Sequence, residues 1–159
     1  MSLKRIVIHW SAGTYTVSSI DKEHYHFIID KDGKVHCGDH KPEANLSTSD
    51  GVYAAHTKGA NAGAIGVAVA AMADAKGPGD LGKYPITAAQ FNGLIRELKE
   101  LTRHYKIPVT PSTVLSHAEI EKTLGIKQAG KIDIAFGIPG HPGLKTAKAC
   151  GDHIRSLIA

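Results

Sequence analysis

The chain has 159 residues, a length that fits one compact domain and can bury roughly 70% of the surface of the unfolded chain. Hydrophobic residues make up 42% and charged residues 21%, which excludes wholesale disorder, and no apolar run approaches the roughly 18 residues of a membrane span. The net charge of +4 permits an anionic partner, but no basic run with interleaved aromatic residues points to nucleic acid.

The beginning of the chain, the cysteines and the chain length lead to further expectations. The beginning of the chain, MSLKRIVIHWSAG, has only a short apolar run broken by a histidine, so we expect no signal peptide and synthesis in the cytoplasm. Cys37 and Cys150 lie far apart and do not form a disulfide framework. We expect a monomer with a single domain over residues 1–159.

The first third of the chain reads as strands and loops. Residues 4–10 (KRIVIHW) are apolar and β-branched, which predicts a buried strand, and the Ser- and Thr-rich residues 11–19 predict a loop without a helix. Residues 25–29 and 34–38 flank an Asp-Lys-Asp-Gly turn and predict a β-hairpin.

The middle of the chain contains the clearest helix. We expect a short strand at 52–56, a strand covered on both faces at 65–71 and a glycine-rich loop at 74–85. Thr87 and Gln90 fit a capping box, and the apolar residues that follow repeat on one helical face, so the sequence predicts a helix over 87–105.

The last third completes an α/β fold. Residues 114–116 predict another short strand, 118–130 a loop with at most a helical turn, and 144–158 a terminal helix. Together these elements predict a single mixed sheet of about five or six strands flanked by helices. The helix over 87–105 would cover one face, with the terminal helix on the same face or at an edge.

Three polar residues stand at places where a metal could be held. His9 lies near the end of the first strand, His117 directly follows the strand at 114–116, and Asp133 lies in a glycine-flanked loop. A catalytic zinc takes three protein ligands and keeps one position open, and imidazole and carboxylate suit that role. The alternative to a metal site is that His9 is an ordinary hydrogen-bonded histidine of the strand and that Lys131 and Asp133 are solvated charges in a loop.

Five sequence blocks carry a resemblance to a known family. They are 6–12 (IVIHWSA), 25–35 (YHFIIDKDGKV), 55–67 (AHTKGANAGAIGV), 116–117 (SH) and 131–133 (KID). In this order they resemble the zinc-dependent N-acetylmuramoyl-L-alanine amidases of type 2, which share a fold with peptidoglycan-recognition proteins and small phage amidases. The resemblance implies that fold, with the metal cleft on the sheet face opposite the long helix.

The resemblance also implies a role for each matching residue. The zinc ligands would be His9, His117 and Asp133, and Tyr25 and Lys131 would be the polar groups beside the metal. His56 would be a substrate-binding histidine that lines the cleft without ligating the metal. Zinc would polarise the scissile carbonyl and lower the pKa of water. Lys131 and Tyr25 would stabilise the oxyanion. The proton for the leaving amine could come from Lys131, Tyr25, His56 or water.

Three departures from the family pattern stand out. The family usually has a helix before the position of Tyr25, and its absence here would open one wall of the cleft. Ala68 stands where many bacterial members have a glutamate, so the general-base role would pass to Tyr25. The longer spacing before Asp133 leaves Glu119 or Glu121 as alternative ligands.

The resulting hypothesis is zinc-dependent hydrolysis of the amide bond between N-acetylmuramic acid and L-alanine in peptidoglycan or a muropeptide. The protein would be an amidase without a separate cell-wall-binding domain. It would serve either as a phage or prophage endolysin released through a holin or as a cytoplasmic enzyme that recycles wall fragments. The alternatives are a non-catalytic peptidoglycan-binding module, a zinc hydrolase of other substrates and a regulatory partner of another protein.

Overall fold

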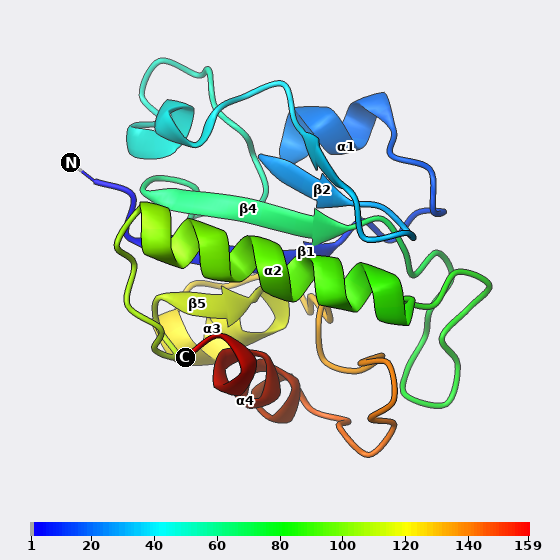
Figure 1. Ribbon diagram of the computed structural model, residues 1–159. Coiled ribbons are helices and arrows are strands. Elements are labelled where there is room, and N and C mark those ends of the chain that lie inside the picture. The colour runs from blue at the N-terminus through cyan, green and yellow to red at the C-terminus, as the bar shows by residue number, and fades with distance from the viewer. Residues whose placement is uncertain (1) are drawn as a thin grey trace.

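The fold is a mixed five-stranded sheet with helices on both faces (Figure 1), as the computed structural model describes it for residues 2–159. The strands are β1 (Arg5–Trp10), β2 (Phe27–Ile29), β3 (Val35–Cys37), β4 (Ala64–Val69) and β5 (Val114–Ser116), in the order β3-β2-β4-β1-β5. The β2–β3 hairpin is antiparallel, and the pairs β2–β4, β4–β1 and β1–β5 are parallel. The predicted α/β class and strand number are confirmed.

Five helical segments surround the sheet. They are α1 (Ser19–His24), the 3-10 helix η1 (Pro42–Leu46), α2 (Ala88–His104), α3 (His117–Leu124) and α4 (Ala147–Ile158). The predicted capping box of α2 is present, because the Thr87 hydroxyl accepts from the Gln90 N–H at 3.0 Å and the Gln90 side chain accepts from the Thr87 N–H at 3.3 Å. Within residues 2–159 no helix has both the length and the apolar character needed to cross a membrane.

The alternation of β1 separates the structural face of the sheet from the functional one. Its even-numbered side chains join the large apolar core under α2 and α4, and α2 runs along this face in Figure 1. Val7 points the other way and packs with Ile120 of α3. Because strand side chains alternate, His9 lies on the α3 face together with Val7. The long helix α2 and His9 therefore lie on opposite faces of the sheet, as predicted.

Two expectations about loops are wrong. Residues 19–24 form α1, where Ser18 and Asp21 make a capping box, and the helix buries no residue. An exposed helix needs no apolar periodicity, so no helical pattern is visible in these residues. Residues 118–130 begin with α3, which ends at Gly125 in the left-handed conformation with φ of 73°.

The strand expected at 52–56 is also absent from the described chain. The side chain of Asn45 takes the place of a neighbouring strand, since its Oδ1 accepts from the Ala54 N–H and its Nδ2 donates to the Ala54 carbonyl, both at 2.9 Å. Asn45 is fully buried in η1, which the sequence did not predict. The segment is therefore held by a side-chain amide instead of a strand ladder.

A buried ion pair attaches α4 to the rest of the fold. The Arg155 guanidinium donates to Glu119 Oε2 at 2.9 Å and to the Val114 carbonyl at 3.0 Å. Glu119 Oε1 in turn accepts from the Ser116 N–H at 2.9 Å, directly before His117. Gly151 makes room for this carboxylate, because a Cβ there would lie 2.1 Å from Glu119 Oε1. Thus α4 supports the segment that carries His117.

Replacing Arg155 by methionine should lower the free energy of unfolding by about 3–5 kcal/mol, because Glu119 would remain buried without its partner. Urea denaturation measures the change. The control is Arg103→Met, which removes an exposed ion pair to Glu100 and should change the stability much less, because water already solvates both charges. Equal losses in the two variants would contradict the role given to the buried pair.

Candidate metal centre

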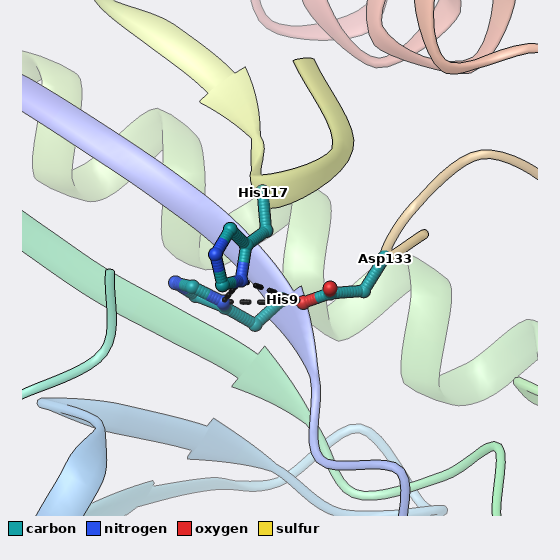
Figure 2. A group of neighbouring side chains, drawn as sticks. All are labelled: His9, His117 and Asp133. Atoms are coloured by element: carbon teal, nitrogen blue, oxygen red, sulfur yellow. Dashed lines mark hydrogen bonds and ion pairs between the residues drawn. The ribbon is translucent and has the colours of Figure 1, made fainter. Parts of the chain in front are cut away.

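Two histidines meet at the carboxyl ends of neighbouring parallel strands. Ile8 of β1 is paired with Ser116 of β5, so the next residues, His9 and His117, come side by side. Their Nδ1 atoms lie 3.1 Å apart. Asp133 Oδ2 lies 3.2 Å from Nδ1 of His9 and 3.5 Å from Nδ1 of His117 (Figure 2). The predicted trio is therefore assembled, with its three ligand atoms within 4.8 Å of one another.

Asp133, the third member of the trio, lies in a loop that is held by contacts of its backbone and of its side chains. The carbonyl of Asp133 accepts from the N–H of Ala118, in the first turn of α3, at 2.6 Å. Ile134 is fully buried, and the ring of Phe136 packs edge-on against Trp10 with centroids 5.1 Å apart. These contacts place the carboxylate without a helix or strand of its own.

The charge state of the trio suits a cation. His9, His117 and Asp133 are 1%, 6% and 7% exposed. Burial lowers the pKa of His9, and this outweighs the attraction of the Asp133 charge, which acts in the opposite direction. The site thus holds a carboxylate with a neutral imidazole beside it at neutral pH.

A chain of hydrogen bonds determines which nitrogen of His9 is free. His56 Nε2 faces the Ala64 carbonyl at 3.2 Å, and a carbonyl can only accept, so this nitrogen carries the proton. Burial lowers the pKa of His56 well below its usual value, which keeps the ring neutral and leaves its Nδ1 as an acceptor. The Thr57 hydroxyl donates to His56 Nδ1 at 2.8 Å, and His9 Nε2 donates to this pair, 3.2 Å from His56 Nδ1 and 3.3 Å from Thr57 Oγ1. Nδ1 of His9 is therefore bare and faces the other two groups.

His117 has the same arrangement, because its Nε2 lies 2.6 Å from the Oε1 of Gln128. Two bare nitrogens and one carboxylate consequently converge without a hydrogen-bond donor between them. A cation at their centre makes this arrangement favourable, because all three groups then act as ligands. The residues present therefore fit a divalent metal.

The other predicted polar residues lie beside the trio. The ring of Tyr25 is 5.1 Å from the ring of His9, centroid to centroid. Burial raises the pKa of Tyr25, and the charges of Asp133 and Asp21 raise it further, so the phenol keeps its proton. Lys131 is exposed and lines the cavity that contains Asp133.

The loop that carries His56 is fixed by the motif around it. Asn61 Oδ1 accepts from the N–H groups of His56 at 3.0 Å and Thr57 at 2.8 Å. The imidazole of His56 lies against the backbone of β4 at Gly66, where a Cβ would be 2.5 Å from its Cγ. Asn61 and Gly66 therefore place His56, although His56 is no member of the ligand trio.

Two cavities meet at the trio. The first, of about 540 Å³, is lined by Tyr25, Asp74 and Asp133 among others. The second, of about 800 Å³, has an apolar part that includes Tyr53 and Ile126, and its charged lining residues are Lys58, Lys127 and Lys131. His56, His117 and Lys131 line both cavities. A substrate could therefore extend to both sides of the metal position.

Two expectations about the cleft wall and the ligands are wrong. The helix expected to be absent before Tyr25 is present as α1, and its His24 lines the first cavity while the His24 Nδ1–H donates to the Ala55 carbonyl at 2.9 Å. Glu119 is paired with Arg155, and Glu121 accepts from the N–H of Gln128.

Further sequence expectations have mixed outcomes. Ala68 pairs with His9 and is fully buried, so it brings no carboxylate to the site. Cys37 and Cys150 are both free thiols. Sequence reasoning missed Gln128 and Thr57, which are polar residues in loops and show no periodicity or spacing that would have singled them out.

Comparison with known proteins gives a family match and a fold match. The profile of a family described as N-acetylmuramoyl-L-alanine amidase matches residues 1–141. A search of curated protein sequences finds no match. Twenty-one chains of solved structures match this chain in fold, and three of them are described below.

The likenesses to solved structures extend over most of the chain. A mutant of PlyL has a TM-score of 0.60 at 16% identity, and the match covers 99% of this chain and 85% of the PlyL chain. The amidase LysC from Clostridium intestinale URNW has a TM-score of 0.50 at 19% identity, with coverages of 79% and 88%. The amidase AmiD from E. coli, in complex with the substrate anhydro-N-acetylmuramic acid-L-Ala-D-gamma-Glu-L-Lys, has a TM-score of 0.51 at 21% identity, with coverages of 73% and 48%.

A buried histidine under the His56 loop should make stability depend on pH. Burial lowers the pKa of His26 to about 4, and the ring bonds Asn45 Oδ1 and the Gly66 N–H at 2.9 Å. Between pH 6.5 and pH 4.5 the unfolded chain takes up a proton at this position and the folded chain does not. The free energy of unfolding should therefore fall by about 2–3 kcal/mol on account of His26 over this range.

Urea denaturation of the metal-free protein at several pH values measures this effect. The control is His26→Gln, which keeps a hydrogen-bonding side chain but cannot take up the proton. The variant should lose stability less steeply between pH 6.5 and pH 4.5 than the wild type. Parallel curves for the two proteins would contradict the assignment.

Proposed function

Because the chain belongs to the N-acetylmuramoyl-L-alanine amidase family, which hydrolyses the amide bond between muramic acid and L-alanine in peptidoglycan, we propose that it does so with a zinc ion held by His9, His117 and Asp133. The observation that carries this proposal is the convergence of two bare imidazole nitrogens and one carboxylate oxygen within 4.8 Å. Zinc accepts this ligand set and leaves a fourth position open for water or substrate.

Each polar neighbour has a role in this proposal. Bound zinc would polarise the scissile carbonyl and lower the pKa of water. Lys131 brings a positive charge to the cleft, two residues from Asp133, and would stabilise the negative charge on the carbonyl oxygen. Tyr25 holds its proton because its pKa is raised, so we assign it as a hydrogen-bond donor to the same oxygen instead of a general base.

The two cavities support a substrate with chemically different ends. The peptide part of a muropeptide bears carboxylates, and the sugar part is largely neutral. Lys58 and Lys127 line the second cavity, whereas Asp74 lines the first, so the charges favour the peptide in the second cavity. His56 lies between the two cavities and would contact substrate near the scissile bond.

The rival function is a peptidoglycan-binding module without catalysis. The complete ligand trio and the proton-bearing groups beside it favour the enzyme. The biological setting that we propose is bacterial cell-wall breakdown, either by an endolysin released through a holin or by an enzyme that recycles wall fragments. The solved structures similar in fold include an endolysin from a Thermus scotoductus bacteriophage.

The proposed reaction can be tested on purified peptidoglycan. We expect free peptides that begin at L-alanine, detected by mass spectrometry, to disappear when a chelator removes the metal and to return when zinc is restored. Intact peptidoglycan in the presence of zinc-loaded protein would favour the binding module. Cleavage that persists with the chelator would exclude a metal-dependent mechanism.

Replacing Lys131 by methionine should lower kcat by about 100-fold, because one positive group beside the developing oxyanion is lost. Zinc content should stay at one equivalent, since Lys131 is outside the ligand trio. The matched control is Lys99→Met, an exposed lysine of α2 on the opposite face of the sheet, which should leave kcat unchanged. Full kcat in the Lys131 variant would show that this lysine has no such role.

A further inference from the structure

Gln128 is buried at 6% exposure in the loop after α3 and touches three parts of the cleft. Its Oε1 lies 2.6 Å from His117 Nε2, its Nε2 donates to the Lys58 carbonyl at 2.7 Å, and its backbone N–H donates to Glu121 Oε1 at 2.9 Å. One side chain therefore connects the loop before β4 with the first residue of α3.

These contacts allow only one orientation of the Gln128 amide. The Lys58 carbonyl can only accept a hydrogen bond, so the NH₂ group of the amide must face it. The amide oxygen then faces His117 Nε2, and because that oxygen can only accept, His117 Nε2 must carry the proton. A reversed amide would bring two oxygens together at Lys58.

We propose that Gln128 is a positioning residue for the metal centre, which holds His117 with Nε2 protonated and Nδ1 bare toward the metal position. This inference rests on the proposed zinc-dependent function. A neutral imidazole has one ring proton, so fixing it on Nε2 frees Nδ1, which lies 3.5 Å from Asp133 Oδ2. The same bond fixes the ring plane, because the Gln128 amide is held at its Nε2 by the Lys58 carbonyl and its backbone N–H by Glu121, so Oε1 cannot follow a rotating imidazole.

A purely structural glutamine is available for comparison in the same chain. Gln90 is fully buried on the opposite face of the sheet, and its Nε2 donates to the carbonyls of Ile29 at 3.0 Å and Ala70 at 2.9 Å. It touches neither the ligand trio nor the residues that bond to it. Loss of Gln90 should therefore affect folding but not metal affinity.

The test compares zinc affinity among four folded proteins, measured by competition with a chromophoric chelator. We expect Gln128→Leu to bind zinc 10- to 100-fold more weakly than the wild type, because His117 loses the acceptor for its Nε2 proton. Gln128→Glu keeps an acceptor for His117 while losing the donor to Lys58, so its zinc affinity should lie closer to that of the wild type. Gln90→Leu should bind zinc as the wild type does, even if it unfolds at lower urea concentration.

A second readout needs no metal. The ¹⁵N chemical shifts of the imidazole in the metal-free protein report the tautomer of His117, which should be the Nε2-protonated form in the wild type and a mixture in Gln128→Leu. If folded Gln128→Leu binds zinc with wild-type affinity, or if Gln128→Glu is as weak as Gln128→Leu, the inference is wrong although the proposed function stands. If the wild type itself binds no zinc, both fail.

Discussion

Three hydrogen-bond acceptors at one point, with no donor between them, form the constraint on which this structure depends. Nδ1 of His9, Nδ1 of His117 and Oδ2 of Asp133 would repel one another in a loose chain. Each histidine is instead held from behind, by His56 and by Gln128, whereas Asp133 is held through its own backbone. The fold thus supplies the rigidity that keeps the three groups together, and the proposed cation would neutralise their repulsion.

The sheet and the helices hold His9, His117 and Asp133 in place. Parallel pairing of β1 with β5 brings two strand ends together, and the helix that begins directly after β5 points its first turn at the same place. The opposite face is covered by α2 and α4, whose apolar core leaves the α3 face free for polar residues. Buried Arg155 then couples α4 to Glu119 and so to the start of α3.

The sequence predicted best those elements whose signal is the burial of apolar residues. The strands β1 and β4 follow from their apolar β-branched residues and the helix α2 from periodicity and a capping box, whereas the candidate ligand His9 was singled out by its place near a strand end together with the family resemblance. The helix α1 was missed because it buries nothing. The role of Asn45 in place of a strand, and the contact between Gln128 and His117, depend on tertiary contacts between loops and leave no pattern in the sequence.

The contact between Gly66 and His56 has a consequence for how this protein can change over evolutionary time. The imidazole occupies the space where a side chain at position 66 would begin. A side chain at position 66 would therefore displace the His56 imidazole, and a displaced His56 would disturb His9, because the two histidines are hydrogen-bonded to each other. Homologous sequences should show the two positions covarying, with a bulkier residue at one accompanied by a smaller residue at the other.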